Sequence, residues 1–236
     1  MVTLGIQSLP HPDHAAMPLL SPLVVAAFLA LGAIAGQTAS PSPEDVASEL
    51  QKKYDAIRDF SADFVQHHES SVLKRKREER GTLLVKKPGK MRWQYKGPDE
   101  KVFVSDGVRM IQYLPLENRA IVGAAPSEDQ VAVFFLAGRG HITRDFNVSF
   151  AQGAPAGDTW TLRLEPKRPQ QEYDWLEVTV DRKTLRIQAF TVAEKQGSRS
   201  TFTLSNFKEN PGLADKAFEF SIPRGAEVSN AGPVKR

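Results

Sequence analysis

The stretch GTLLVKKPGKMRWQYKGPDEKVFVSDG, from Gly81 to Gly107, decides the fold of this chain. It places short strands between tight turns, among them KPGK and SDG. In its middle strand Met91, Trp93 and Tyr95 share one face, because successive side chains of a strand point to opposite sides. The pattern predicts a curved antiparallel sheet with one apolar face. The stretch contains no nucleophile, metal cluster or phosphate-binding loop, which indicates a container wall rather than a catalytic centre.

The same alternation continues on both sides of this stretch. Phe60, Ala62 and Phe64 share one face of a strand that begins near Phe60. Further strands are expected at about 80–87, 90–96, 100–105, 108–114, 119–123, 145–151, 159–166, 174–181, 185–192 and 200–207. Their short links make sequential strands antiparallel neighbours. The sequence therefore predicts a mainly β domain with helices, built on one antiparallel sheet of about eleven strands.

A helix is expected before the first strand. Ser42 suits the N-cap and Pro43 the first helical position. Val46, Leu50, Tyr54 and Ile57 then recur at helical spacing, so one face of this helix lies on something apolar.

A second helix is expected from Glu128 to Ala137. Ser127 and Gln130 have capping-box spacing, and Gly138 ends the pattern. Because its body, Val131 to Ala137, has no polar position, this helix is predicted to be covered on both sides or to be covered only part of the time. Two helices are too few to fill the interior of such a curled sheet, so we expect a cavity beneath them.

Four segments, taken in order, resemble the periplasmic outer-membrane lipoprotein carriers, the LolA family. They are FSADFVQ at 60–66, VKKPGKMRW at 85–93, VSDG at 104–107 after Pro98, and FEFSIPRGAEV at 218–228. The resemblance covers roughly residues 43 to 229. It implies an unclosed half-barrel with a helical lid over an apolar cavity. It also implies that the protein shields the acyl chains of lipoproteins between two membranes.

Pattern and resemblance together give a set of expected site residues. The acyl-chain cavity is assigned to Val46, Leu50, Phe60, Phe64, Leu84, Met91, Trp93, Val102 and Val104. The lid is assigned to Val131, Val133, Phe134, Phe135 and Leu136. The resemblance further implies a lid latch at Lys87, where the family typically has an arginine, with Arg92 or Arg139 as alternatives.

Composition limits the possible partners. The chain has 236 residues, a formal net charge of only +3 and no aromatic side chain within the basic run Lys74 to Arg80, so we expect no nucleic-acid binding. That run is either a solvated hairpin or a docking surface for an acidic partner or an anionic membrane. The absence of cysteine excludes disulfides and a lipid anchor, and thereby the lipid-anchored receptor class.

The N-terminal region predicts export. Leu23 to Ala35 has no polar side chain and small residues follow, which is typical of a signal peptide cleaved after Ala35 or Ala39. No positively charged residue precedes it, so a retained membrane anchor is the alternative, and Met17 is a better start than Met1. We expect a signal peptide at 1–39, with 1–16 a mis-annotated start, and a single carrier domain at 40–236 in the periplasm.

Catalytic patterns are missing. His67 and His68 are adjacent in a strand and point to opposite faces, so they cannot hold one metal ion together. No G-x-S-x-G elbow occurs, and we expect no enzyme activity, cofactor or metal. The resemblance implies acylated lipoproteins, an inner-membrane ATP-driven release complex and a lipid-anchored outer-membrane receptor as partners of a monomer. A periplasmic sensor and a general lipid-binding half-barrel are the alternatives.

Overall fold

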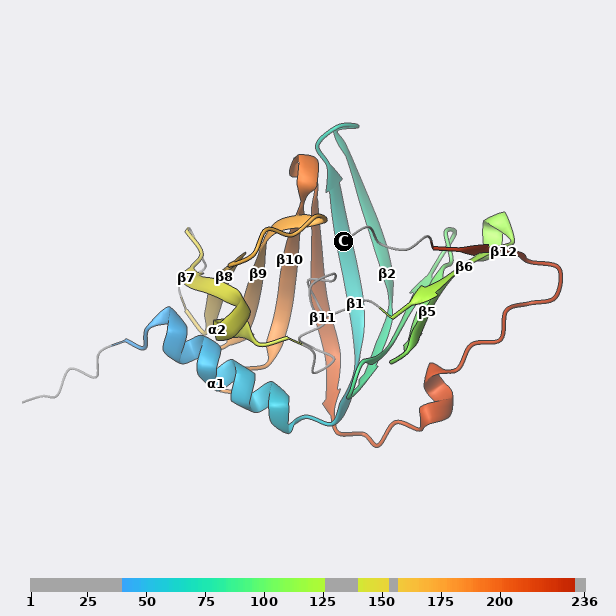
Figure 1. Ribbon diagram of the computed structural model, residues 1–236. Coiled ribbons are helices and arrows are strands. Elements are labelled where there is room, and N and C mark those ends of the chain that lie inside the picture. Colours follow the sequence, from blue (N-terminus) through green and yellow to red (C-terminus); the bar gives the residue numbers. More distant parts are fainter. Residues whose placement is uncertain (1–39, 126–139, 153–156, 232–236) are drawn as a thin grey trace, which may run out of the picture. The chain divides into compact units, whose positions relative to one another are not determined.

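The strand pattern folds into one large sheet. The computed structural model describes residues 40–125, 140–152 and 157–231 (Figure 1). The chain divides into two units between Ser40 and Pro41, and the sheet belongs to the second. Its strands are β1 (Asp59–Ser70), β2 (Arg75–Lys86), β3 (Lys90–Lys96), β4 (Val102–Asp106), β5 (Arg109–Leu114), β6 (Arg119–Ala124), β7 (Phe146–Phe150), β8 (Thr159–Pro166), β9 (Tyr173–Asp181), β10 (Ile187–Glu194), β11 (Arg199–Glu209) and β12 (Glu227–Asn230).

The sheet consists of two meanders, β1 to β6 and β7 to β11, with the short strand β12 at one edge. Its twelve strands run in the order β12-β6-β5-β4-β3-β2-β1-β11-β10-β9-β8-β7. The two meanders meet where β1 pairs with β11, and all neighbours are antiparallel except β12, which lies parallel to β6. Since the edge strands β7 and β12 do not pair with each other, the sheet stays open. The predicted unclosed antiparallel sheet is confirmed, with one strand more than expected.

Helix α1 (Pro43–Ala56) begins as its sequence predicts. Ser42 Oγ accepts from the Asp45 backbone N–H at 3.1 Å, and the Asp45 carboxylate accepts from the Ser42 N–H at 3.1 Å. This reciprocal pair satisfies two backbone donors that the helix leaves free. The apolar face of the helix buries Val46, Leu50 and Tyr54.

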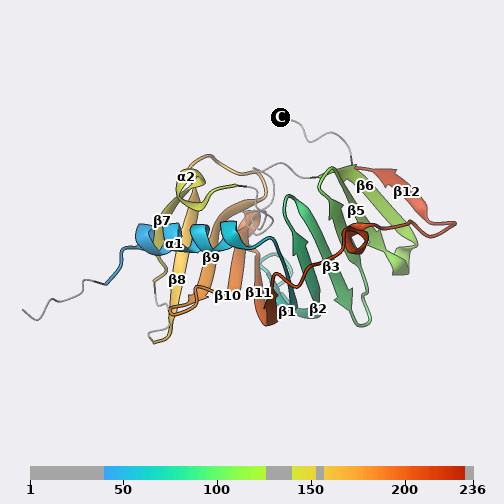
Figure 2. The same cartoon turned by 90° about the horizontal axis from the view of Figure 1, so that it is seen from below.

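Helix α1 lies across one end of strands β7 to β10 (Figures 1 and 2). The Ile187 N–H of β10 donates to Tyr54 Oη at 3.1 Å, and the Ile142 N–H donates to Gln51 Oε1 at 2.9 Å. Ile142 begins the short helix α2 (Ile142–Asp145), which the sequence did not predict. The predicted lid helix, Glu128 to Ala137, lies outside the described residues.

The segment between β11 and β12 crosses the outer face of the first meander. Its short 3-10 helix η5 (Asp215–Phe218) buries Phe218 completely. Lys86 and Lys90 both pair with the Asp215 carboxylate, at 2.7 Å and 3.1 Å. This segment, residues 210–226, is called the C-terminal strap below. It covers apolar side chains on the outside of the sheet, among them Val104, Ile111 and Ala120.

Candidate ligand-binding pocket

A pocket opens on the inner face of the sheet. It has a volume of about 460 Å³, within the range of small-molecule and lipid-sized sites. Residues from both meanders line it: Gln66, Met91, Trp93, Tyr95, Phe103, Ser105, Met110, Glu172, Tyr173, Val192, Glu194, Ser200 and Phe202. Most of the lining is aromatic or aliphatic, so the pocket suits an apolar ligand.

Strand register places the predicted residues Met91 and Trp93 in this wall. Trp93 lies opposite Leu83, and Met91 lies opposite Val85, so all four side chains point inward. The rings of Trp93 and Phe202 lie 5.3 Å apart between centroids, which joins the two meanders across the pocket. Phe202 was missed because its nearness to Trp93 depends on the pairing of β1 with β11, which no local pattern reveals.

Phe64, another predicted cavity residue, packs behind this wall and is not among the residues that line the described pocket. It is fully buried, and its ring centroid lies 5.1 Å from that of Trp93 and 4.9 Å from that of Tyr95. Val46, Leu50 and Phe60 are buried in the main core, where α1 packs on the sheet, and they do not line the described pocket.

Three predicted cavity residues lie on the other face of the sheet. Leu84 on β2 lies opposite Arg92 on β3, and Arg92 lies opposite Val104 on β4, so these three side chains share one face. Val102 lies opposite Gln94, which also points away from Trp93. This placement corrects the prediction for Leu84, Val102 and Val104. The prediction failed because β4 carries apolar side chains on both faces. One face lies toward the pocket and the other lies beneath the C-terminal strap.

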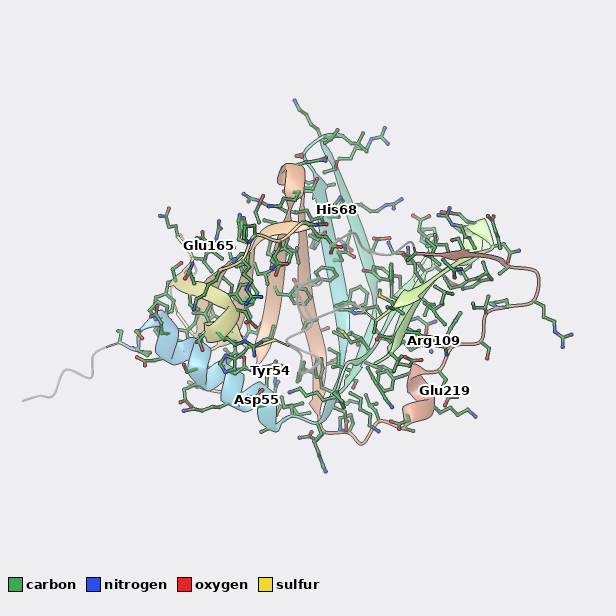
Figure 3. All side chains as sticks on the ribbon, in the orientation of Figure 1. Tyr54, Asp55, His68, Arg109, Glu165 and Glu219 are labelled. Atoms are coloured by element: carbon green, nitrogen blue, oxygen red, sulfur yellow. The ribbon has the colours of Figure 1, made fainter. Side chains whose placement is uncertain are left out.

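A row of hydrogen-bonded polar groups lines one end of the pocket. Tyr95 Oη donates to Gln66 Oε1 at 2.7 Å, and Gln66 Nε2 donates to Ser200 Oγ at 3.4 Å. Ser200 Oγ donates to Glu194 Oε1 at 2.7 Å, and His68 Nδ1 lies 3.0 Å from the same hydroxyl. His68 sits toward the hairpin end of β1 (Figure 3). Burial raises the pKa of Tyr95, so its hydroxyl stays a neutral donor.

Acidic groups supply the formal charge in the pocket wall. Glu172 and Glu194 line it, and the described lining contains no lysine or arginine. Partial desolvation raises the pKa of the Glu172 carboxyl. The polar end therefore favours neutral or cationic ligand groups over phosphates.

Lys87, the predicted latch, contacts helix α1. Its Nζ donates to the Tyr54 carbonyl in the last turn of that helix. Burial lowers the pKa of Lys87, and the nearby Asp55 carboxylate opposes this shift. The predicted lid residues Val131, Val133, Phe134, Phe135 and Leu136, and the alternative latch Arg139, lie outside the described residues, so a contact between Lys87 and the lid stays a prediction.

Arg92 contacts the C-terminal strap on the outer face of the sheet. Its Nη1 donates to the carbonyls of Ala217 and Glu219, each at 3.3 Å, and so fastens the C-terminal strap to the outer face. Alternation along β3 directs it away from Trp93. This contact corrects the assignment of Arg92 to the lid latch.

The two adjacent histidines diverge as expected from strand geometry. His67 lies 3.9 Å from Glu78, whereas His68 lies 3.7 Å from Glu194 on the inner face. Across the described residues, no three His, Cys, Asp or Glu side chains are grouped to hold a metal ion. Nor does any helix in that part of the chain have the length and apolarity to cross a membrane.

Comparison with known proteins finds relatives over most of the chain. The family model described as "Outer membrane lipoprotein carrier protein LolA" matches residues 55–221. A protein named outer-membrane lipoprotein carrier protein from Pasteurella multocida (strain Pm70) is 30% identical over 186 residues, covering 79% of this chain and 87% of that protein. One of the same name from Aeromonas salmonicida (strain A449) is 31% identical over 206 residues, covering 86% and 97%.

A solved structure shares the fold. An uncharacterized conserved protein from Thermus thermophilus aligns with a TM-score of 0.50 at 13% identity, over 80% of this chain and 98% of that one. Such low identity speaks to the fold alone. The family model reaches from the end of α1 into the C-terminal strap and so takes in both meanders and every residue that lines the pocket. The chain thus belongs to the LolA family of outer membrane lipoprotein carrier proteins.

Proposed function

We propose that this protein is a periplasmic carrier that holds the acyl chains of lipoproteins in the inner-face pocket while they cross between two membranes. The observation that supports this most directly is the open sheet around an apolar pocket of about 460 Å³. Acyl chains fit such a wall because each buried methylene contributes about 0.8 kcal/mol. The polar row from Tyr95 to Glu194 offers donors and acceptors to the ester and amide groups where the chains join the cargo.

Release requires that this gross affinity is largely offset. If Val131 to Leu136 fill the pocket of the empty carrier, cargo displaces existing apolar contacts and gains only the difference in free energy. Loading then becomes nearly reversible. Direction comes from outside, through an inner-membrane ATP-driven release complex at one end and tighter binding to a lipid-anchored outer-membrane receptor at the other. In this scheme the protein acts as a monomer and catalyses no reaction.

Co-purified ligand identifies the function. Protein isolated gently from its own periplasm should contain acylated lipoproteins, detected by mass spectrometry as diacylated or triacylated N-terminal peptides. Phospholipid or glycolipid as the main ligand would favour a general lipid shuttle instead. A bound protein segment without acyl chains would favour the sensor.

Export is tested by the mature N-terminus. Sequencing of the purified periplasmic protein should begin near Gly36 or Ser40, after removal of the apolar segment. A mature protein that retains residues 20–35 would contradict the signal-peptide assignment and support a membrane anchor.

A further inference from the structure

The tip of the β1–β2 hairpin exposes two large apolar side chains. Val72 and Leu73 occupy the turn between the strands, with 69% and 67% of their surfaces exposed. Leu73 is held in place because its N–H donates to Ser70 Oγ at 3.1 Å. Two adjacent exposed aliphatic side chains at the end of a hairpin contribute little to the core, and both are available for contact with another surface.

Cationic side chains lie directly behind this apolar tip. Lys76 pairs with Glu69 and Arg77 with Asp99, at 2.5 Å and 3.0 Å. Lys74 and Arg75 are exposed, and among the described residues neither has an ion-pair partner. A groove of about 400 Å³ runs beside them, lined by Glu69, Ser70, Ser71, Lys74, Arg75, Lys76, Gly197 and Arg199. Four of these residues are basic and one is acidic, so the groove attracts anions.

The hairpin extends well beyond β3 on one side, and on the other side β11 and the β10–β11 turn flank it as far as Ser71. β2 begins at Arg75 but pairs with β3 only from Arg80 onward, whereas β1 stays paired with β11 as far as Glu69, one residue from its end. The turn therefore projects from the sheet as a narrow ribbon (Figure 1). Its base is braced, since Ser71 Oγ donates to the Gln196 carbonyl and the Ser71 N–H donates to Ser198 Oγ at 3.3 Å. A projecting, braced tip can meet a flat surface ahead of the neighbouring strand β3.

We propose that this hairpin tip docks on the surface of an anionic lipid bilayer. Val72 and Leu73 enter the boundary between headgroups and acyl chains, while Lys74, Arg75 and the groove bind lipid phosphates. The order along the hairpin favours a membrane over an acidic protein. The apolar pair comes first and the cations follow, which matches the order of depth in a bilayer, where apolar material lies beneath the phosphate layer.

Docking at this tip orients the ligand pocket. Arg199 lines the basic groove and the next residue, Ser200, lines the polar end of the pocket. The polar end therefore faces the membrane side when the hairpin docks, and cargo has a short path between bilayer and pocket. This consequence rests on the proposed function, whereas docking itself does not.

Vesicle binding of the empty carrier tests the proposal. The protein is sedimented with phosphatidylcholine vesicles, with and without phosphatidylglycerol, at low salt and in about 1 M salt, where the Debye length is about 3 Å. We expect binding to the anionic vesicles at low salt and little binding in the other conditions. Lys74→Ser with Arg75→Ser should weaken it roughly thirtyfold, from about 1 kcal/mol per charge. Val72→Ser with Leu73→Ser should weaken it at least tenfold.

Matched variants control for surface changes elsewhere. Val108 and Leu116 are 76% and 73% exposed in other turns, so Val108→Ser with Leu116→Ser should leave vesicle binding unchanged. The exposed Lys183 and Lys208 provide the same control for charge. Equal binding by the parent and both tip variants would overturn the proposal, as would no vesicle binding at all. Tip-dependent binding to an acidic protein without vesicle binding would assign the site to a protein partner instead.

The outcome is independent of cargo binding. Acyl-ligand affinity of the tip variants, measured in vesicle-free solution, should equal that of the parent. If vesicle binding fails while ligand binding persists, docking is refuted and the carrier function stands. If ligand binding fails while vesicle binding persists, the carrier function is refuted and docking stands.

Discussion

The ring of Phe64 lies directly over the backbone of Gly81, on the neighbouring strand. A Cβ atom added at Gly81 would approach Phe64 Cζ to 2.7 Å and would also collide with the Gln94 carbonyl. The two residues are register partners, and Tyr95 stands opposite Gly81 on the other side. The missing side chain is what lets the ring of Phe64 pack against Trp93 and Tyr95, which line the pocket.

Gly81→Ala should therefore destabilise the fold. The added methyl group forces the ring or the strand to move, and overpacking of this kind costs about 1–3 kcal/mol. Urea unfolding of the variant should show a lower midpoint. Thr82→Ala, one residue along on the outer face, is the control and should cost less than half as much. A Gly81→Ala protein as stable as the parent would mean that Phe64 does not occupy this position.

Trp93→Ala should weaken acyl-ligand binding. The indole forms part of the pocket wall, so its removal takes away apolar contact area and should cost tenfold or more in affinity. Titration with a fluorescent diacylated peptide measures this. Trp160 is the control, since it stacks on Phe150 at 5.1 Å outside the pocket lining, and Trp160→Ala should retain parental affinity. Equal losses in both variants would show that the effect is general destabilisation.

Glu172→Gln should change how stability depends on pH. Desolvation raises the pKa of this carboxyl in the folded state, so between its ordinary and raised values the folded protein binds more protons than the unfolded chain. Stability supplied by this group is thus present at low pH and lost as pH rises through that window. The variant should be more stable than the parent near pH 7 and equal to it near pH 4, by urea unfolding. A Glu172→Gln protein less stable near pH 7 would show that the carboxylate makes a favourable contact.

Local patterns predicted the strands but not which apolar face lines the pocket. Met91, Trp93 and Tyr95 were expected to share one face because polar residues alternate with them, and the register puts all three on the same face. Val102 and Val104 were not placed correctly, because the outer face of β4 is buried by the C-terminal strap, which lies more than a hundred residues away in sequence. Periodicity reports that a side chain is buried and gives no information on what buries it.

The pocket residues of the second meander were not predicted from the sequence, for a related reason. Tyr173, Val192 and Phe202 lie in strands that were predicted, with bounds within a few residues of those found. Their approach to Trp93 follows from the pairing of β1 with β11, whose partners are more than a hundred residues apart. Pairing over such separations leaves no short-range signal. The open half-barrel was predicted from the resemblance to the carrier family. The residues that line the pocket could be identified only from the register of the strands.

Arg92→Met should loosen the C-terminal strap without affecting the pocket. The substitution removes the donors to the Ala217 and Glu219 carbonyls while keeping much of the side-chain length, at a cost of about 1–3 kcal/mol. Hydrogen exchange in residues 213–220 should become faster, while acyl-ligand affinity stays at the parental value. A loss of ligand affinity with an undisturbed strap would support the original assignment of Arg92 to the lid latch.

Lys87 is the position where the latch hypothesis is decided. Its ammonium donates to the Tyr54 carbonyl at the end of α1, and a charge-assisted hydrogen bond of this kind contributes about 1.5–3 kcal/mol. If the same group holds the lid closed over the empty pocket, Lys87→Leu should accept lipoprotein readily and fail to pass it on. Lys87→Arg should close more tightly, because the guanidinium offers five donors in a planar fork. Transfer from loaded carrier to receptor-bearing membranes measures both, with Lys86→Leu as the control because Lys86 contacts the C-terminal strap. Unloading of Lys87→Leu at the parental rate would limit the role of Lys87 to fastening α1.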